Sequence, residues 1–248
     1  MPVDTAQRKA RLQTATQILT KLPPLLTRLG SATTADRHIY IAGNGYDFEE
    51  FTVPIIKRLD EKLAGVACVW PFECEFENYI GEKLFTLPQS YVEPSTRPDP
   101  VLIYCQSLIS DLNEIGVALD AIASKIQPSR VLIVCLRITQ PVAADLDRLS
   151  SSIRIELVSN EVASADIDLR TLKKQAFEKL DDRVVKPGLL MSDWLIERIT
   201  RPKLDHTPDP APQPTRPNEP SGRGKTIARD RRDVGYGVSN APGRAFGT

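Results

Sequence analysis

The chain has 248 residues, and its 41% hydrophobic and 26% charged residues are typical of a globular domain with a full hydrophobic core. It contains no apolar run of membrane-spanning length, and residues 1–11 lack the apolar stretch of a signal peptide, so we expect a cytoplasmic protein without membrane contact. The formal net charge is zero, but residues 1–30 carry five bases and one acid, and residues 201–248 carry nine bases and five acids. Because nucleic-acid-binding domains carry their basic surface on the folded part, this distribution disfavours nucleic acid as a partner.

Residues 1–30 are predicted to form an amphipathic helix, because leucine, isoleucine and alanine recur at helical spacing from Leu12 to Leu29. Pro23 and Pro24 are expected to interrupt this helix, and Gly30 is expected to end it. Two roles are open: packing on the core, or binding a membrane surface or a partner. The polar face is rich in threonine and only weakly basic, which disfavours a membrane.

Residues 31–200 alternate apolar runs with helical patterns, which predicts one α/β domain. The predicted strands are residues 38–42, 66–70, 101–104, 130–136 and 153–158, and the predicted helices are residues 51–63, 112–126, 169–180 and 189–199. Strands that are separated by helices pair in parallel through right-handed crossovers, so we expect a mostly parallel sheet with flanking helices. Residues 73–100 are irregular and acidic, and form either a long flap or a hairpin beside the sheet.

Gly43, Asn44 and Gly45 follow the first predicted strand and resemble the start of a dinucleotide-binding fingerprint. The third glycine is absent and four acids follow closely, which is a poor setting for pyrophosphate. The four acids are Asp47, Glu49, Glu50 and Asp60. We interpret the two glycines as part of a turn, which disfavours a nicotinamide-dependent oxidoreductase.

The four cysteines lack the paired spacing of a zinc site, and the only histidines, His38 and His206, are far apart in the sequence. Cys68 lies inside an apolar run, and Cys105 and Cys135 lie at or near the ends of two others, which is typical of small buried residues. We therefore predict no metal site and no metal-dependent hydrolase. A serine hydrolase is disfavoured because no Gly-x-Ser-x-Gly sequence occurs.

The C-terminal part divides into a disordered, Pro-rich and basic linker (residues 201–234) and a peptide rich in glycine and aromatic residues (residues 235–248). Residues 201–220 contain seven prolines and two aliphatic residues, too few to build a core. The terminal peptide either docks on the chain's own core, docks on a partner protein, or is a frayed end.

Residues 101–136 resemble the nucleotide core of type I phosphoribosyltransferases, and uracil phosphoribosyltransferases in particular. In that family an apolar strand leads to two acids, then to a loop of small residues with threonine and glycine, then to a helix and a second strand. Residues 101–104 match the first strand and residues 134–136 match the end of the second. Residues 141–146 and 153–157 match the next helix and strand, and residues 235–248 are similar to the family's base-binding flap.

This resemblance implies a loop that binds phosphoribosyl pyrophosphate (PRPP), with Mg²⁺ as a cofactor only when PRPP is bound. The phosphate-loop candidates are Gln106, Ser107, Ser110, Asp111 and Asn113, and the flap candidates are Tyr236, Val238, Arg244 and Phe246.

Several of the loop positions differ from the family's pattern. Cys105 and Gln106 stand where the family has acids, and Asp111 and Leu112 stand where it has glycines. A carboxylate about 4 Å from a phosphate would repel it by roughly 4 kcal/mol at an intermediate dielectric. We expect Ser110 and Asn113 to cap the helix at residues 112–126.

Three functions follow from these observations. The first, which we favour, is a non-catalytic phosphoribosyltransferase-like protein with a regulatory or adaptor role in nucleotide metabolism, acting through ligand or protein binding. The second is a divergent active phosphoribosyltransferase, in which Glu73, Glu75 or Asp111 replaces the missing acids. The third is a scaffold whose residues 201–248 dock a partner protein. Assembly as a homo-oligomer is compatible with all three.

Overall fold

A computed structural model describes residues 5–36, 38–79, 81–149, 153–164, 167–180 and 192–200. The chain divides into two units, Met1–Pro202 and Lys203–Thr248, and every described residue belongs to the first. The predicted linker and terminal peptide therefore lie outside the described residues. No helix in the described ranges is long and apolar enough to span a membrane.

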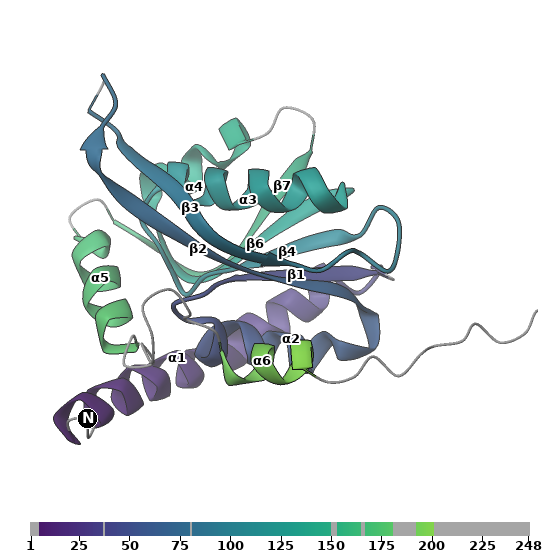
Figure 1. Cartoon of the computed structure of the whole chain (residues 1–248), viewed down its shortest axis with the longest axis horizontal. Coiled ribbons are helices and arrows are strands. Elements are labelled where there is room, and N and C mark those ends of the chain that lie inside the picture. Colours follow the sequence, from purple (N-terminus) through teal and green to yellow (C-terminus); the bar gives the residue numbers. More distant parts are fainter. Residues whose placement is uncertain are drawn as a thin grey trace, which may run out of the picture. The chain divides into compact units, whose positions relative to one another are not determined.

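The core is a seven-stranded, mostly parallel sheet with helices on both faces, as the sequence predicts (Figure 1). The strands are β1 (Ile39–Asn44), β2 (Leu63–Glu77), β3 (Lys83–Val92), β4 (Val101–Cys105), β5 (Leu108–Ile109), β6 (Arg130–Thr139) and β7 (Arg154–Ala163). Their order is β3-β2-β1-β4-β6-β5, and β7 pairs with β6. Among these pairs, only β2 and β3 are antiparallel. The short strand β5 follows β4 in the chain and, like β4, pairs in parallel with β6.

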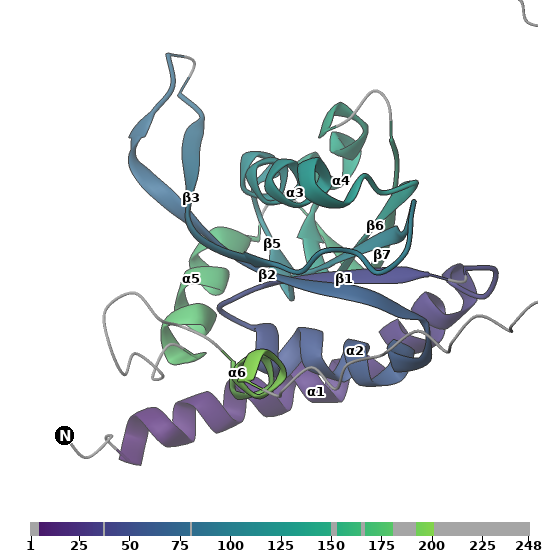
Figure 2. The ribbon, with the colours of Figure 1, turned by 45° about the vertical axis from the view of Figure 1, so that its right-hand side comes forward.

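The helices are α1 (Thr5–Ala32), α2 (Val53–Leu59), α3 (Leu112–Ile126), α4 (Gln140–Ala144), α5 (Leu169–Leu180) and α6 (Asp193–Thr200). Figure 2 shows α1, α2 and α6 on one face of the sheet, α3 and α4 on the other, and α5 at the end of the sheet where the parallel strands have their carboxyl ends. On the first face Leu25 and Ile56 pack in one core with Ile103, and on the second face Ile122 packs in another core with Ile133.

The N-terminal helix is continuous through Pro23 and Pro24, so the predicted interruption is wrong. Both prolines are exposed, while Leu22, Leu25 and Leu29 are buried against the sheet. Burial of these leucines offsets the backbone hydrogen bonds that the prolines remove. The helix also continues two residues beyond Gly30. Of its two expected roles, packing on the core is confirmed.

Residues 73–100 begin as a hairpin rather than a flap. Strand β2 continues to Glu77, seven residues beyond its predicted end, and β3 returns antiparallel to it. Hydrogen bonds between Asn78 and Glu82 close the turn. The hairpin projects beyond the end of the sheet at which α5 lies (Figures 1 and 2).

Candidate functional site

The chain reverses its direction of strand addition between β1 and β4. From β1 it proceeds to β2 on one side, and from β4 it proceeds to β6 on the other. In open α/β sheets, the carboxyl ends of two such strands form the crevice where ligands bind. Here that crevice holds Asn44 and Asp47 from the β1 side, and Gln106 and Ser107 from the β4 side. All four side chains are buried.

Gln106 is fixed by hydrogen bonds at both ends of its amide. Its Oε1 accepts a hydrogen bond from the hydroxyl of Tyr104 at 2.9 Å. Its Nε2 donates to the carbonyl oxygen of Leu108 at 2.9 Å and to Oε1 of Glu114 at 3.2 Å. The side chain of Gln106 is fully buried, so it supports the loop from beneath and does not face a ligand.

A buried ion pair lies at the centre of the crevice. Glu114, in the first turn of α3, is 2% exposed, and its Oε2 accepts a hydrogen bond from Nζ of Lys173 on α5. Lys173 is itself 9% exposed, and Asn44 donates to the other carboxylate oxygen of Glu114 at 3.5 Å. The centre of the crevice is therefore occupied by side chains of the chain itself.

Asp47 lies beside this ion pair and is fully buried. Its Oδ2 accepts a hydrogen bond from the backbone N–H of Ser107 at 2.7 Å, which ties the loop after β1 to the loop after β4. Its Oδ1 has no hydrogen-bond partner among the residues that the structure describes. Desolvation, opposed by the hydrogen bonds from Ser107, raises the pKa of Asp47 to about 7.

The N-terminus of α3 is capped by Asp111, not by Ser110 or Asn113 as the sequence analysis expects. Asp111 Oδ1 accepts a hydrogen bond from the backbone N–H of Asn113 at 2.9 Å. The side chain of Asn113 instead donates to the carbonyl oxygen of Lys83 on the hairpin, at 3.2 Å. The sequence predicts that the Asp111 carboxylate repels phosphate from this loop. In the structure this carboxylate also accepts a hydrogen bond from one of the backbone N–H groups that a phosphate would use. Burial raises the pKa of Asp111 above its usual value.

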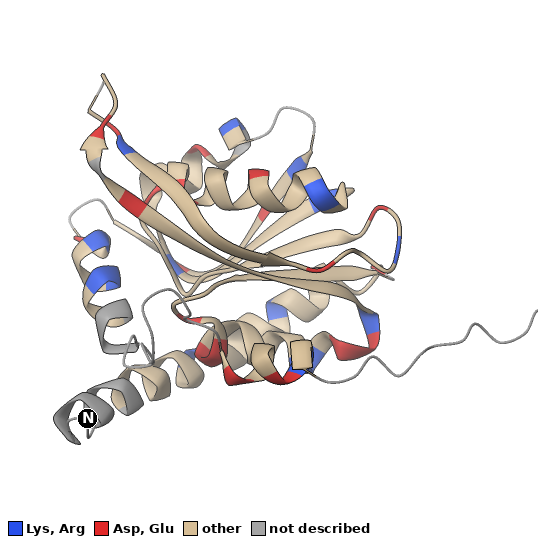
Figure 3. Cartoon of the chain, viewed as in Figure 1, with Lys and Arg blue, Asp and Glu red and all other residues tan. Residues whose placement is uncertain are grey.

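A cavity of about 670 Å³ opens between the β2–β3 hairpin, the N-terminus of α3 and α5. Its walls carry three aromatic side chains, four cations and two carboxylates. The aromatic residues are Tyr46, Phe72 and Phe85, and the charged residues are Lys83, Arg170, Lys173, Lys174, Glu73 and Glu114. Figure 3 shows the basic residues of α5 as blue bands.

Arg170 connects two acids at this cavity. Its Nη2 lies 3.4 Å from Glu73 Oε1 and 3.6 Å from Asp111 Oδ2. The two acids come from different elements, the hairpin and the start of α3, and Arg170 on α5 holds them together. Within the described ranges, no three acidic, cysteine or histidine side chains are grouped as a metal site.

The predicted phosphate-loop residues are close together in the structure, but only Ser110 lines this cavity. Gln106 and Ser107 are buried beneath the loop, and Asp111 and Asn113 are hydrogen-bonded at the helix end. The flap candidates Tyr236, Val238, Arg244 and Phe246 lie outside the described residues, as does the side chain of Glu75.

Four residues of this crevice are absent from the sequence-based candidates, namely Asn44, Asp47, Glu114 and Lys173. The available signal is the two polar residues at the end of the buried strand β1, Asn44 at its last position and Asp47 three residues beyond it. Lys173 gives no comparable signal, because its contact with Glu114 spans 59 residues and depends on how α5 lies over the sheet.

Three of the four cysteines are small buried residues of the core, as predicted. Cys68, Cys105 and Cys135 are completely buried, and all four cysteines are free thiols. Burial raises the pKa of the Cys68 and Cys105 thiols well above their usual value. Neither thiol is therefore a nucleophile at neutral pH.

Gly45 allows the loop after β1 to lie directly against the indole ring of Trp70. A Cβ atom at this position would overlap Nε1 of that ring. We therefore predict that Gly45→Ala lowers the free energy of unfolding by about 1–3 kcal/mol, the usual cost of overpacking. Urea denaturation measures this change. Gly30→Ala is the control, because α1 leaves open space there and alanine should stabilise that helix by roughly 0.5–1 kcal/mol. Equal effects of the two substitutions would contradict this interpretation.

Comparisons with known proteins identify structural neighbours but no sequence family. No family model and no curated protein match the chain. A protein of Aquifex aeolicus aligns with a TM-score of 0.35 at 12% identity over 54% of this chain, which spans only 59% of that protein. A purine phosphoribosyltransferase from Pyrococcus horikoshii aligns at 0.39 and 10% identity, over 61% of this chain and 93% of that one. An adenine phosphoribosyltransferase from Thermoanaerobacter pseudethanolicus aligns at 0.37 and 12% identity, over 60% and 83%. Similarity at this level does not assign a family.

Proposed function

We propose that this chain is a phosphoribosyltransferase-like protein that binds a ligand or a partner and does not transfer phosphoribosyl groups. Its likeness to phosphoribosyltransferases, and to the uracil-specific enzymes in particular, rests on the sequence of β4, α3 and β6 and of the loop after β4. The 670 Å³ cavity is lined by aromatic side chains such as Tyr46 and Phe85, which suit a planar ring, and by cations such as Lys174, which suit a phosphate group.

The observation that carries this proposal is the burial of the two positions where the family has acids. Cys105 and Gln106 are both 0% exposed. Both N–H groups of the Gln106 amide are used by Leu108 and Glu114, and its oxygen accepts from Tyr104 in a fully buried position, out of reach of ribose hydroxyls or of the water shell of a magnesium ion.

The electrostatics of α3 support the same proposal. A phosphate at a helix N-terminus needs free N–H groups and no competing anion. Here Asp111 caps the helix and Glu114 adds a second carboxylate in the first turn. The cation nearest to Glu114 is Lys173, which is already paired with it.

The proposal is tested by measuring release of pyrophosphate from PRPP with Mg²⁺ and each common nucleobase in turn. We expect a rate no higher than that of the protein-free blank, while an active phosphoribosyltransferase in the same assay serves as the positive control. Turnover with any one nucleobase would overturn the proposal, provided that the purified chain is folded by circular dichroism.

A second candidate, the divergent active enzyme, is favoured by one observation. Glu73 and Asp111 are brought together through Arg170 beside the cavity, where they could replace the missing acids. In this case Glu73→Gln and Asp111→Asn should each abolish Mg²⁺-dependent turnover. Glu77→Gln, on the same strand but outside the cavity lining, should leave it unchanged. Without turnover in the unmodified chain, this candidate fails.

A further inference from the structure

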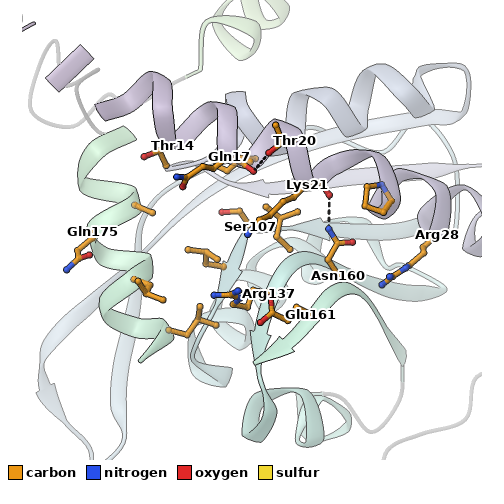
Figure 4. Close-up of a pocket in the computed structure, with 17 residues that line it drawn as sticks. Thr14, Gln17, Thr20, Lys21, Arg28, Ser107, Arg137, Asn160, Glu161 and Gln175 are labelled. Carbon is orange, nitrogen blue, oxygen red and sulfur yellow. Dashed lines mark hydrogen bonds and ion pairs between the residues drawn. The ribbon is translucent and has the colours of Figure 1, made fainter. Parts of the chain in front are cut away.

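A second cavity lies on the other side of α5, enclosed by α1, α5 and the ends of β6 and β7 (Figure 4). Its volume is about 650 Å³, within the range of pockets that hold small molecules in proteins. α5 supplies walls to both cavities: Leu172 and Ala176 line this one, while Lys173 and Lys174 line the cavity described above.

One part of this cavity is apolar. Leu136 and Ile18 are buried side chains of its wall, and Leu169 and Leu172 face it from α5. Leu172 is 43% exposed. An apolar ligand group in the cavity would cover this exposed surface.

The other part of the cavity is basic. Lys21, Arg28 and Arg137 line it, with Glu161 as the single carboxylate among its lining residues. Arg137 pairs with Glu161 at 2.7 Å. Among the described residues, neither Lys21 nor Arg28 forms an ion pair, so two positive charges are left for a bound anion. Figure 4 shows Lys21 and Arg28 on α1, opposite Arg137 and Glu161.

The basic part is held in place by contacts between α1 and β7. Asn160 Nδ2 donates to the carbonyl oxygen of Lys21 at 2.7 Å, a bond drawn in Figure 4. Arg28 Nη1 donates to the carbonyl oxygen of Ser159. These bonds fix the backbone at Lys21 and the guanidinium of Arg28 before any ligand arrives, which lowers the entropy cost of binding.

We propose that this cavity binds a small amphipathic anion, with a carboxylate or phosphate-monoester head on Lys21 and Arg28 and an apolar body against Leu136, Leu169 and Leu172. This cavity shares no lining residue with the cavity beside the α3 N-terminus, and it touches the β1–β4 crevice only at Ser107.

The test uses the fluorescence of 8-anilinonaphthalene-1-sulfonate, an anion with an apolar body, titrated with the full chain. The Lys21→Gln, Arg28→Gln double variant should bind it at least about tenfold more weakly, since each lost charge-assisted hydrogen bond is of that order. Arg148→Gln is the control, because its side chain is 67% exposed outside the cavity, and it should bind as the unmodified chain does. Lys21→Gln alone is the second variant, because Arg28 also holds β7.

Competition then identifies the head group. Decanoate or decyl phosphate should displace the dye, and the one that displaces it at lower concentration defines the head. The proposal is overturned if the single and the double variant both bind the dye as tightly as the unmodified chain does. It is also overturned if neither decyl anion displaces the dye while the neutral N-phenyl-1-naphthylamine binds the unmodified chain and the double variant equally, because the cavity would then bind apolar groups without recognising an anion.

Discussion

Replacing Lys173 with alanine is expected to lower the free energy of unfolding by about 3–5 kcal/mol, the usual cost of leaving one charge of a buried ion pair without its partner. Glu114 is 2% exposed, and after the substitution its carboxylate keeps only the amide donors of Gln106 and Asn44. Equilibrium denaturation in urea measures the loss.

Two further variants separate the ion pair from a general effect on α5. Lys174→Ala changes the neighbouring exposed lysine and should alter stability by less than about 0.5 kcal/mol. Replacing Lys173 and Glu114 together with methionine and leucine should recover most of the loss, because no unpaired charge is left buried. If Lys173→Ala and Lys174→Ala behaved alike, the ion pair would not hold α5 in the crevice.

The stability of the chain is expected to fall as pH rises from about 4 to about 7, because of Asp47. The pKa of Asp47 is about 7 in the folded chain, against roughly 3.9 in an unfolded one. Between these values the folded state holds a proton that the unfolded state has released, so raising the pH favours unfolding. The contribution is fully present below the unfolded pKa and is lost by the folded pKa, on the order of 4 kcal/mol in total.

Asp47→Asn removes the ionisable group and should flatten this part of the pH profile. The measurement is the urea midpoint of both proteins at pH 5, 6, 7 and 8, and the difference between the two curves isolates Asp47 from other titrating groups. Asp120→Asn, an exposed substitution on α3, should leave the profile as it is. Parallel curves for the unmodified chain and Asp47→Asn would contradict the assignment.

The sheet and several helices could be predicted because local patterns alone determine them. Residues 112–126 form α3 with the predicted ends, since Ile115, Leu119 and Ile122 share one buried face. Its end at Gln127 adopts a left-handed conformation with φ of 48°, a common way to stop a helix. Residues 169–180 form α5, also as predicted.

The errors arise where tertiary contacts outweigh local preference. Pro23 and Pro24 would end an isolated helix, but the leucines around them are buried against the sheet. Asp111 rather than Ser110 caps α3, and the guanidinium of Arg170 on α5 stabilises the capping carboxylate of Asp111. Local sequence does not contain this information.

The candidate site was predictable only in part, for the same reason. The loop after β4 could be recognised from its sequence, and its missing acids were visible at Cys105 and Gln106. The contact that fills the crevice was not visible, because Lys173 and Glu114 belong to helices that are separated by two strands of the sheet in the sequence, β6 and β7.

The crevice between β1 and β4 is expected not to accept PRPP, because the chain's own side chains occupy its centre. Isothermal titration calorimetry with the magnesium complex of PRPP tests it directly. We expect no binding heat at concentrations up to the millimolar range, for the unmodified chain and for Ser110→Ala alike. Micromolar binding that Ser110→Ala abolishes would contradict this expectation, because Ser110 is the predicted loop residue that lines the cavity beside the α3 N-terminus.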